Sequence, residues 1–320
     1  MKKFLISIDT EGDNLWNWEY GKAITTENSL FIPRFQNLCE EYGFKPTYLI
    51  NLEMALDERF VSFAKKKSEE GLCEIGMHLH SWNTPPLIKL AERVDGIKPG
   101  HEFITEHSCE IMQQKIAYLI DVIEKQFGRK PVSHRSGRWA TNDDFLRLLA
   151  KAGIKYDVSV TPGINWNRAN GLTSGSIGPD YSDFPTMPYL VHDTGLLEIP
   201  LTVKMNHRYV IDSNRTLKHR AGNLYRAVKG RGYKMLRPNG ENIDDMLYLV
   251  QQTRKSNDEY LMFMLHSSEM MPAGNPIFNT EEKIEKLYSD LRVLFDYVGN
   301  FFEGMTIEQY GKRCADRIRR

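Results

Sequence analysis

The sequence has no excess of charge of either sign. Its 42 lysine and arginine residues balance 42 aspartate and glutamate residues, which leaves a formal net charge of zero at pH 7. A strongly basic or acidic chain would attract nucleic acid or a charged membrane surface through its overall field, and this chain has no such field. We therefore expect no nucleic-acid partner, although a local basic patch could still bind an anion.

Cysteines and long apolar runs are also scarce. The four cysteines, Cys39, Cys73, Cys109 and Cys314, lie far apart without a Cys-x-x-Cys pair, so we expect reduced thiols and no disulfide. No stretch approaches the roughly 20 apolar residues of a transmembrane helix. The N-terminus passes from a short apolar run directly into acidic residues and lacks the features of a secretory leader. We therefore expect a protein that begins near Met1, has no transmembrane segment and is cytoplasmic.

Strand and helix patterns alternate along the 320 residues. The composition, 41% hydrophobic and 26% charged, is typical of a globular chain with a sizeable core. Amphipathic helical patterns, of which residues 104–127 are the longest, separate short apolar runs that predict strands. The predicted strands are residues 4–8, 47–50, 73–80, 132–136, 156–160, 197–203 and 260–265. This alternation favours parallel βαβ units in a barrel or a doubly wound sheet, and the lack of a repeat or linker favours a single domain over residues 1–320.

Two segments interrupt the alternation. Residues 161–196 are rich in Gly, Pro, Asn and Ser and are too long for a simple connection, which is typical of functional loops. Residues 214–237 contain eight lysines and arginines and no acid. This basic stretch is either a solvated face or a surface that recognises a phosphorylated ligand.

Four polar clusters follow predicted strands, at the edge where parallel α/β folds bind ligands. The first is the segment of residues 9–13, Asp-Thr-Glu-Gly-Asp. Residues two apart in an extended chain point the same way, so Asp9, Glu11 and Asp13 can converge. Crowded carboxylates repel each other unless a cation or a proton lies between them, so we expect a site here. A loop of solvated acids is the alternative.

The second cluster contains two histidines. His78 and His80 lie two residues apart and would share one face of an extended strand. A lone histidine is most often an ordinary core or surface residue. Two imidazoles beside carboxylates from a neighbouring strand suit a divalent transition metal, and ligands without thiolate favour zinc in a catalytic site.

The third and fourth clusters carry arginine and histidine. Arg135 and Arg138 can bind carboxylates through paired hydrogen bonds or form structural salt bridges, and Trp139 offers a flat apolar face for a ring. The fourth cluster, residues 263–269, delivers His266 into a polar turn. An imidazole there can act as a general acid or base near neutral pH.

The order of these clusters resembles that of the polysaccharide deacetylase superfamily, carbohydrate esterase family 4 and its relatives. The resemblance runs from the first residues to about Ser268, and the matching segments are residues 8–12 (Ile-Asp-Thr-Glu-Gly), 74–78 (Glu-Ile-Gly-Met-His), 135–139 (Arg-Ser-Gly-Arg-Trp), 156–160 (Tyr-Asp-Val-Ser-Val) and 265–267 (Leu-His-Ser). A narrower pattern of Asp-Thr-Glu-Gly-Asp, His-Leu-His, Gly-Arg-Trp and Leu-His-Ser-Ser-Glu is similar to a branch associated with bacterial surface-glycan, including O-antigen, biosynthesis. The resemblance implies an irregular (β/α)7 TIM-like barrel, a divalent metal, usually zinc, and hydrolysis of an N- or O-acetyl group on a sugar.

The resemblance also implies roles for individual residues. Asp9 matches the catalytic base, and Glu11 matches a metal-binding carboxylate. His78 matches the first metal-binding histidine. Arg135 would pair with Asp9 and set its protonation, and His266 would be the general acid.

One departure from the family pattern concerns the metal ligands. The second histidine of the family usually lies four residues after the first, and Trp82 occupies that place after His78. His80 is the nearest substitute and could ligate the metal if the strand stays extended. Otherwise Asp9 or Asp13 would complete the ligand set, or metal binding would be weak or lost. The first motif is one residue longer than the commoner Asp-Asp-Gly form, so the roles of the base and the metal-binding carboxylate could be exchanged.

On this basis we expect a metal-dependent carbohydrate deacetylase that acts on an acetylated sugar. In the cytoplasm this sugar would be linked to a nucleotide or a lipid diphosphate, which the basic stretch would suit. The expected substrate-binding residues are Trp82, Arg138 and Trp139. Two other classes remain open: a degenerate barrel that binds glycans without hydrolysing them, which the tryptophan at position 82 supports, and a hydrolase of non-sugar amides.

Overall fold

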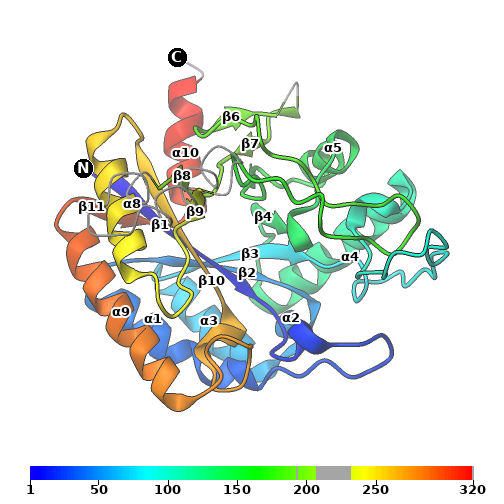
Figure 1. The fold of residues 1–320 in the computed structure, drawn as a ribbon, viewed down its shortest axis with the longest axis horizontal. Coiled ribbons are helices and arrows are strands. Elements are labelled where there is room, and N and C mark those ends of the chain that lie inside the picture. Colours follow the sequence, from blue (N-terminus) through cyan, green and yellow to red (C-terminus); the bar gives the residue numbers. More distant parts are fainter. Residues whose placement is uncertain (192–193, 207–231, 319–320) are drawn as a thin grey trace, which may run out of the picture.

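Strands and helices alternate in the structure, as the sequence pattern predicts. The computed structural model describes residues 1–191, 194–206 and 232–318, and Figure 1 shows helices arranged around the outside of a curled sheet. The strands are β1 (Lys2–Thr10), β2 (Pro46–Ile50), β3 (Glu74–Leu79), β4 (Ser133–Ser136), β5 (Tyr156–Asp157), β6 (Tyr189–Leu190), β7 (Leu197–Glu198), β8 (Val203–Met205), β9 (Tyr233–Met235), β10 (Tyr260–His266) and β11 (Phe302–Met305). The α-helices are α1 (Ile32–Glu41), α2 (Leu52–Leu56), α3 (Glu58–Glu69), α4 (Cys109–Phe127), α5 (Asp143–Lys151), α8 (Ile243–Lys255), α9 (Glu281–Gly299) and α10 (Ile307–Ile318). Residues 214–231 of the basic stretch lie outside the described residues.

The sheet is parallel through its centre. Its strands follow the order β10-β1-β2-β3-β4-β5-β7, and β6 pairs antiparallel with β7 at the far edge. β11 pairs in parallel with the first half of β1, and β2 pairs with the second half from Ile6 onward. The parallel βαβ organisation expected from the sequence is therefore present.

The described part of the chain forms a curled half-barrel and does not confirm the full (β/α)7 barrel that we expected. Among the described residues no ladder joins β10 to β6 at the opposite edge. Pro200 follows β7 and has no N–H group, so regular pairing cannot continue there. The backbone N–H of Met262 instead donates to the Thr202 hydroxyl at 2.8 Å, and that of Met264 donates to the Leu236 carbonyl at 3.1 Å. The structure thus shows a curled half-barrel.

The two faces of the curled sheet bury separate cores. Successive residues of a strand face opposite sides, so Phe4 and Ile6 of β1 pack in the larger core beneath the helices, whereas Leu5 belongs to a smaller core inside the curl. Ile307 and other residues of α10 pack in this inner core. Asp9 lies on the same side of β1 as Leu5 and therefore points into the curl.

Capping side chains set the helix boundaries. The Ser108 hydroxyl accepts a hydrogen bond from the backbone N–H of Ile111, so α4 begins at Cys109 and not at residue 104 as the apolar pattern predicts. Gly128, with a φ of 74°, ends the same helix. Among the residues that the structure describes, no helix combines the length and the apolar character needed to cross a membrane.

Candidate active site

The C-terminal ends of β1, β3, β4 and β10 meet inside the curl. Parallel pairing places Asp9 beside His266 and His78 beside Arg135. Asp9, His78 and Arg135 are buried, and His266 is partly exposed. Because parallel strands end at the same edge of the sheet, polar residues that are far apart in the sequence become neighbours here.

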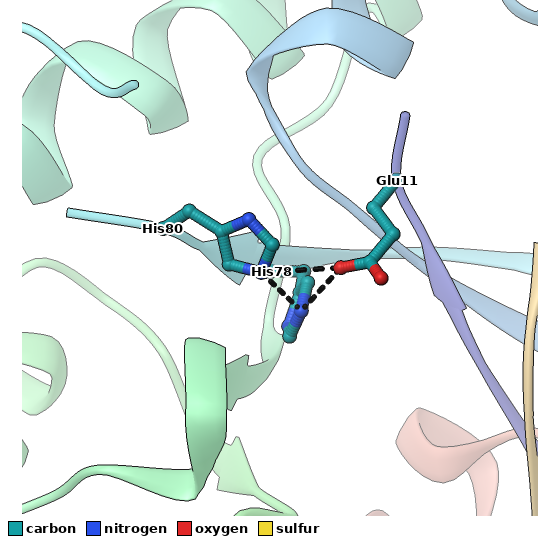
Figure 2. Close-up of side chains that lie close together, drawn as sticks. All are labelled: Glu11, His78 and His80. Carbon is teal, nitrogen blue, oxygen red and sulfur yellow. Dashed lines mark hydrogen bonds and ion pairs between the residues drawn. The ribbon is translucent and has the colours of Figure 1, made fainter. Parts of the chain in front are cut away.

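Three potential metal ligands converge at this edge (Figure 2). Glu11 follows β1, whereas His78 and His80 come from the end of β3. The Nε2 atoms of the two histidines lie 2.9 Å apart, and Glu11 Oε2 lies 3.4 Å from that of His78 and 3.1 Å from that of His80. Because β3 stays extended through Leu79, the two imidazoles leave the strand on the same side.

This set of donor atoms fits a divalent cation. Nδ1 of His78 lies 2.9 Å from the Arg135 carbonyl oxygen, which accepts its proton, so when the ring is neutral its Nε2 presents a lone pair. Nε2 of His80 faces the same point, and two lone pairs at 2.9 Å repel each other unless a cation or a proton lies between them. Ligand atoms bound to tetrahedral zinc at about 2.0–2.1 Å lie roughly 3.3 Å apart, close to the separations here.

The charge states of Glu11 and His80 also suit a metal, whereas in the metal-free chain burial acts to lower the pKa of His78 but the nearby Asp9 and Glu11 carboxylates outweigh it and raise that pKa. Burial alone would raise the pKa of Glu11, but hydrogen bonds with His78 and His80 hold it well below its usual range. Burial, reinforced by the charge of His78, lowers the pKa of His80 to about 4. An ionised carboxylate and a neutral imidazole are the forms in which these residues bind metal ions.

Asp9 is held by a buried arginine. Nη1 of Arg135 donates to Asp9 Oδ1 at 2.5 Å, while its Nη2 donates to the Ser7 hydroxyl at 2.8 Å and its Nε to the Val158 carbonyl at 3.1 Å. Burial acts to raise the pKa of Asp9, but the charges of Arg135 and His78 outweigh it and lower the pKa. The second carboxylate oxygen, Oδ2, lies 3.9 Å from His78 Nε2. Asp9 is thus an ionised carboxylate beside the three potential ligands.

His266 approaches the same point from β10. Its Nε2 lies 3.8 Å from Asp9 Oδ2 and 3.8 Å from Glu11 Oε1. Its other nitrogen, Nδ1, lies 2.9 Å from Nη2 of Arg237, which also donates to Glu269 Oε1 at 2.7 Å. Since a guanidinium group only donates, Nδ1 accepts and the ring proton lies on Nε2, toward the two carboxylates.

Sequence reasoning placed Arg237 in the basic stretch and Glu269 in the fourth cluster, but it gave neither residue a role at this site. Burial acts to raise the pKa of Glu269, but the charge of Arg237 and a hydrogen bond from the backbone N–H of His266 lower it to about 2. This hydrogen bond, to Glu269 Oε2, is 2.8 Å long. The His-Ser-Ser-Glu sequence has the spacing of a capping box, a signal that could have found Glu269. No local pattern marks Arg237, because His266 lies 29 residues away in the sequence.

Two of the expected substrate-binding residues are engaged by the protein itself. Trp82 stacks against the rings of His80 and His101, with centroids 4.2 Å and 5.0 Å away. Arg138 donates to the backbone carbonyls of His101 and Asn170. Much of the flat surface of Trp82 and two nitrogen atoms of Arg138 are therefore already occupied.

The turn after β4 presses against a potential ligand. A Cβ atom at Gly137 would lie 2.3 Å from Cδ2 of His80 and 2.8 Å from the Leu79 carbonyl oxygen, so only glycine fits there. Arg138 and Trp139 follow with φ angles of 55° and 64°, in the left-handed region that other residues seldom adopt. Such strain is often found beside functional sites.

Two polar residues of the motifs lie outside the cluster. Asp13 accepts hydrogen bonds from the Thr25 hydroxyl and from the Asn28 backbone N–H, the latter at 3.2 Å, so it holds a loop. His134 points to the opposite side of β4 from its neighbour Arg135, and its Nδ1 lies 2.6 Å from Asp157 Oδ1. Neither residue contacts the three potential metal ligands directly.

Solved structures share this fold, although neither protein-family models nor curated protein sequences give a match. A Mycobacterium smegmatis protein assigned to the polysaccharide deacetylases superposes with a TM-score of 0.55 at 14% identity, over 98% of this chain and 90% of that one. A branching enzyme from Thermococcus kodakaraensis gives 0.53 at 10% identity, over 97% and 70%. A 4-α-glucanotransferase from Thermococcus litoralis gives 0.52 at 16% identity, over 97% and 40%.

These likenesses define the class of fold, a curled parallel α/β sheet with polar residues at the C-terminal ends of its strands. At such low identities they show a shared fold alone. Proteins named for polysaccharide deacetylation and for glucan transfer share it, so the fold does not select between these activities. Any choice between these activities must therefore rest on the side chains at the strand ends.

Proposed function

We propose that this protein is a metal-dependent hydrolase that removes an N- or O-linked acetyl group from a sugar. The observation that carries the proposal is the cluster of Glu11, His78 and His80 beside Asp9, an ionised carboxylate paired with Arg135. Two imidazoles and one carboxylate are typical ligands of a catalytic divalent metal, most simply zinc. A protein assigned to the polysaccharide deacetylases has the same fold, which supports the proposal.

Glucan transfer, the activity named for two of the structural neighbours, suits these side chains less well. Cleavage of a glycosidic bond commonly uses two carboxyl groups that flank the bond. Asp9 instead lies near the end of β1 and Glu11 directly follows that strand, and each contacts basic side chains. The histidine pair has no evident part in that chemistry, whereas it is well suited to hold a metal.

Glu11, His78 and His80 would hold the cation. A divalent ion supplies Lewis acidity toward water and toward the acetyl carbonyl. The chain itself orients the ligands, because the Arg135 carbonyl fixes the ring of His78 and Gly137 leaves room for the ring of His80.

Asp9 would take the proton from the attacking water. Arg135 holds one carboxylate oxygen, and Oδ2 is left without a hydrogen-bond donor in the part of the chain that the structure describes. The lowered pKa of Asp9 keeps the carboxylate ionised at neutral pH. A positioned base of this kind contributes about 10²–10⁴-fold to the rate.

His266 would protonate the departing nitrogen or oxygen of the sugar through Nε2. Arg237 occupies Nδ1, so the ring in this structure is neutral. Transfer of a proton from the ring to a leaving group requires a second proton on the imidazole. Glu269 Oε2, 3.4 Å from Nδ1, can accept a hydrogen bond from that proton once Arg237 moves away.

Trp139 is the aromatic residue best placed to receive the sugar ring. The guanidinium carbon of Arg135 lies 5.1 Å from the centroid of the Trp139 ring, so the indole lies close to the Asp9–Arg135 pair. Trp166 stacks nearly parallel to it, with centroids 6.2 Å apart. Trp82 and Arg138 would contribute through the parts of their side chains that the protein leaves uncovered.

We further propose a place for this activity in bacterial surface-glycan biosynthesis, including that of O antigen. The support is the similarity of the four polar motifs to that branch of deacetylases. The substrate would then be a sugar that is linked to a nucleotide or lipid-diphosphate carrier in the cytoplasm. The charge of the basic stretch of residues 214–237 would suit the diphosphate, and residues 214–231 of it lie outside the described part of the chain.

The test is acetate release by protein that has been stripped with a chelator and reloaded with Zn²⁺. We expect acetate from N- or O-acetylated sugars with the zinc-loaded protein and none with the stripped protein. Binding of zinc and sugar without acetate release would indicate a degenerate glycan-binding protein. Release of ammonia or an arylamine from non-sugar amides, without acetate from sugars, would indicate an amide hydrolase. Either outcome overturns the proposal.

A further inference from the structure

A large pocket lies beside Trp82, the residue that stacks on the potential ligand His80. Its volume is about 800 Å³, in the range of sites that enclose organic ligands. Its wall includes Trp18 and Tyr20 from the segment after β1, and Leu87 and other residues from the loop after β3. Because Trp82 contacts both His80 and this pocket, one substrate molecule could reach from the candidate metal site into the pocket.

Three polar groups of the pocket wall already have partners within the protein, whereas Lys89 and Glu92 line it as exposed charged residues. The indole N–H of Trp18 donates to the Lys22 carbonyl at 2.7 Å, and the Tyr20 hydroxyl accepts from the backbone N–H of Glu102 at 3.3 Å. The Glu102 carboxylate in turn lies 3.0 Å from Nε2 of His107. A sugar chain or a nucleotide would need free donors and acceptors for its hydroxyls, and these groups do not supply them. The wall is better suited to hydrocarbon.

The mouth of the pocket exposes aliphatic side chains. Leu87 is 67% exposed and Ile88 is 42% exposed, and both line the pocket. Covering such side chains with a ligand is favourable by about 25 cal/mol for each Å² of apolar surface removed from water. Lys89 follows them, is exposed, and has no ion-pair partner among the described residues, so it is available to an anionic group.

We infer that this pocket binds the hydrocarbon chain of a lipid-linked acetylated sugar, with the sugar at Asp9 and the chain beyond Trp82. The inference rests on the proposed deacetylase function and deepens it, because it selects a lipid carrier over a nucleotide. Lys89, which lines the pocket and is exposed, would be the counter-ion of a phosphate that joins sugar and chain.

The test measures binding of farnesyl phosphate to the full-length protein by titration calorimetry, with inorganic phosphate and UDP-N-acetylglucosamine as the comparison ligands. We expect farnesyl phosphate to bind at least about tenfold more tightly than inorganic phosphate, because its chain leaves water. The double variant Leu87→Glu/Ile88→Glu places charge in the mouth and should weaken that binding at least about tenfold. Val94→Glu is the matched control, since Val94 is 92% exposed and does not line the pocket.

Three results would overturn the inference. Farnesyl phosphate that binds no more tightly than inorganic phosphate would show that no chain enters the pocket. An equally large loss of farnesyl phosphate binding in Val94→Glu would show that lipid contacts only the outer surface of the loop and does not enter the pocket. Tighter binding of UDP-N-acetylglucosamine, weakened by the Leu87 and Ile88 changes, would assign the pocket to a nucleotide sugar.

Acetate release from a water-soluble acetylated sugar, measured on the same preparation, separates this inference from the proposed function. Acetate release without binding of farnesyl phosphate would overturn the lipid pocket and leave the deacetylase. Binding of farnesyl phosphate by zinc-loaded protein that releases no acetate from any acetylated sugar would overturn the deacetylase and leave a lipid-binding pocket.

Discussion

The backbone carbonyl of Arg135 accepts a hydrogen bond from Nδ1 of His78, at 2.9 Å. The side chain of the same arginine donates to Asp9 at 2.5 Å. Arg135 therefore orients a potential metal ligand with its main chain and the proposed base with its side chain. Because β4 pairs with β3 and lies on the same sheet as β1, the rigid sheet fixes both contacts, which favours an accurately positioned site.

Replacing the proposed base should separate metal binding from turnover. In Asp9→Asn the side chain keeps its shape, and its amide oxygen can still accept from Arg135, but it cannot take a proton from water. We expect zinc content to remain and acetate release to fall by about 10²–10⁴-fold. Metal analysis and an acetate assay on one preparation measure both quantities.

Asp13→Asn is the control for this change, because Asp13 follows the same strand but holds the loop at Thr25 and Asn28. It should retain most of the turnover. Full activity in Asp9→Asn would exclude Asp9 as the base.

His80 is the proposed ligand whose position departs from the pattern of the polysaccharide deacetylases, so its removal is the sharpest test of the proposed metal site. His80→Ala removes one of three converging donors and should lower zinc affinity by more than about tenfold, since changes to residues that merely support ligands cost 10–100-fold. His107→Ala removes a buried histidine that pairs with Glu102 and should leave zinc affinity unchanged. Unchanged zinc binding by His80→Ala would remove His80 from the ligand set.

Much of the fold could be predicted from the sequence because its central strands are buried on both sides. Such strands appear as largely apolar runs, and those that became β1, β2 and β10 were predicted in this way. β11, with Glu303 and Gly304 at its centre, has no such run and was missed. The predicted strand 197–203 is divided because Pro200 interrupts it, and the open edge of the sheet follows from the same interruption.

The candidate site was predictable where it depends on strand periodicity. The two-residue spacing of His78 and His80, with parallel pairing of neighbouring strands, is enough to bring them to Glu11. The contact of Arg237 with His266 and the pocket beside Trp82 depend on how loops pack across the strand ends. No periodic pattern in a single sequence describes that packing.

A single methyl group at Gly137 should disturb the proposed metal site without replacing any of its ligands. The Cβ atom of Gly137→Ala would overlap the His80 ring and the Leu79 carbonyl, so the imidazole or the turn must move. We expect about tenfold weaker zinc binding and a loss of stability of about 1–3 kcal/mol. Gly299→Ala is the control, because a Cβ there meets only the Phe44 ring, at 3.9 Å, and both quantities should stay near those of the original protein. Wild-type zinc affinity in Gly137→Ala would show that this turn does not position His80.

Glu53, in the first turn of α2, should make the stability of the metal-free protein depend on pH. Burial raises its pKa from the usual 4.5 to about 7, against a hydrogen bond from Asn83. Because the folded state holds the proton more tightly than the unfolded chain, the stabilisation is complete below about pH 4.5. This stabilisation is lost as the pH rises through about 7. The difference between the pKa values of the folded and unfolded states corresponds to about 3 kcal/mol in the free energy of unfolding.

Glu53→Gln replaces this acid with an amide that does not titrate. The variant should therefore exceed the original protein in free energy of unfolding by up to about 3 kcal/mol at pH 8, and by much less at pH 4.5. Urea unfolding at both pH values, with a chelator present so that no metal couples to the nearby Glu11, measures the difference. Glu58→Gln changes an exposed acid in the first turn of α3 and should have a small effect at both pH values. A stability difference for Glu53→Gln that is equal at pH 4.5 and pH 8 would show that the folded protein does not bind a proton at Glu53 in this range.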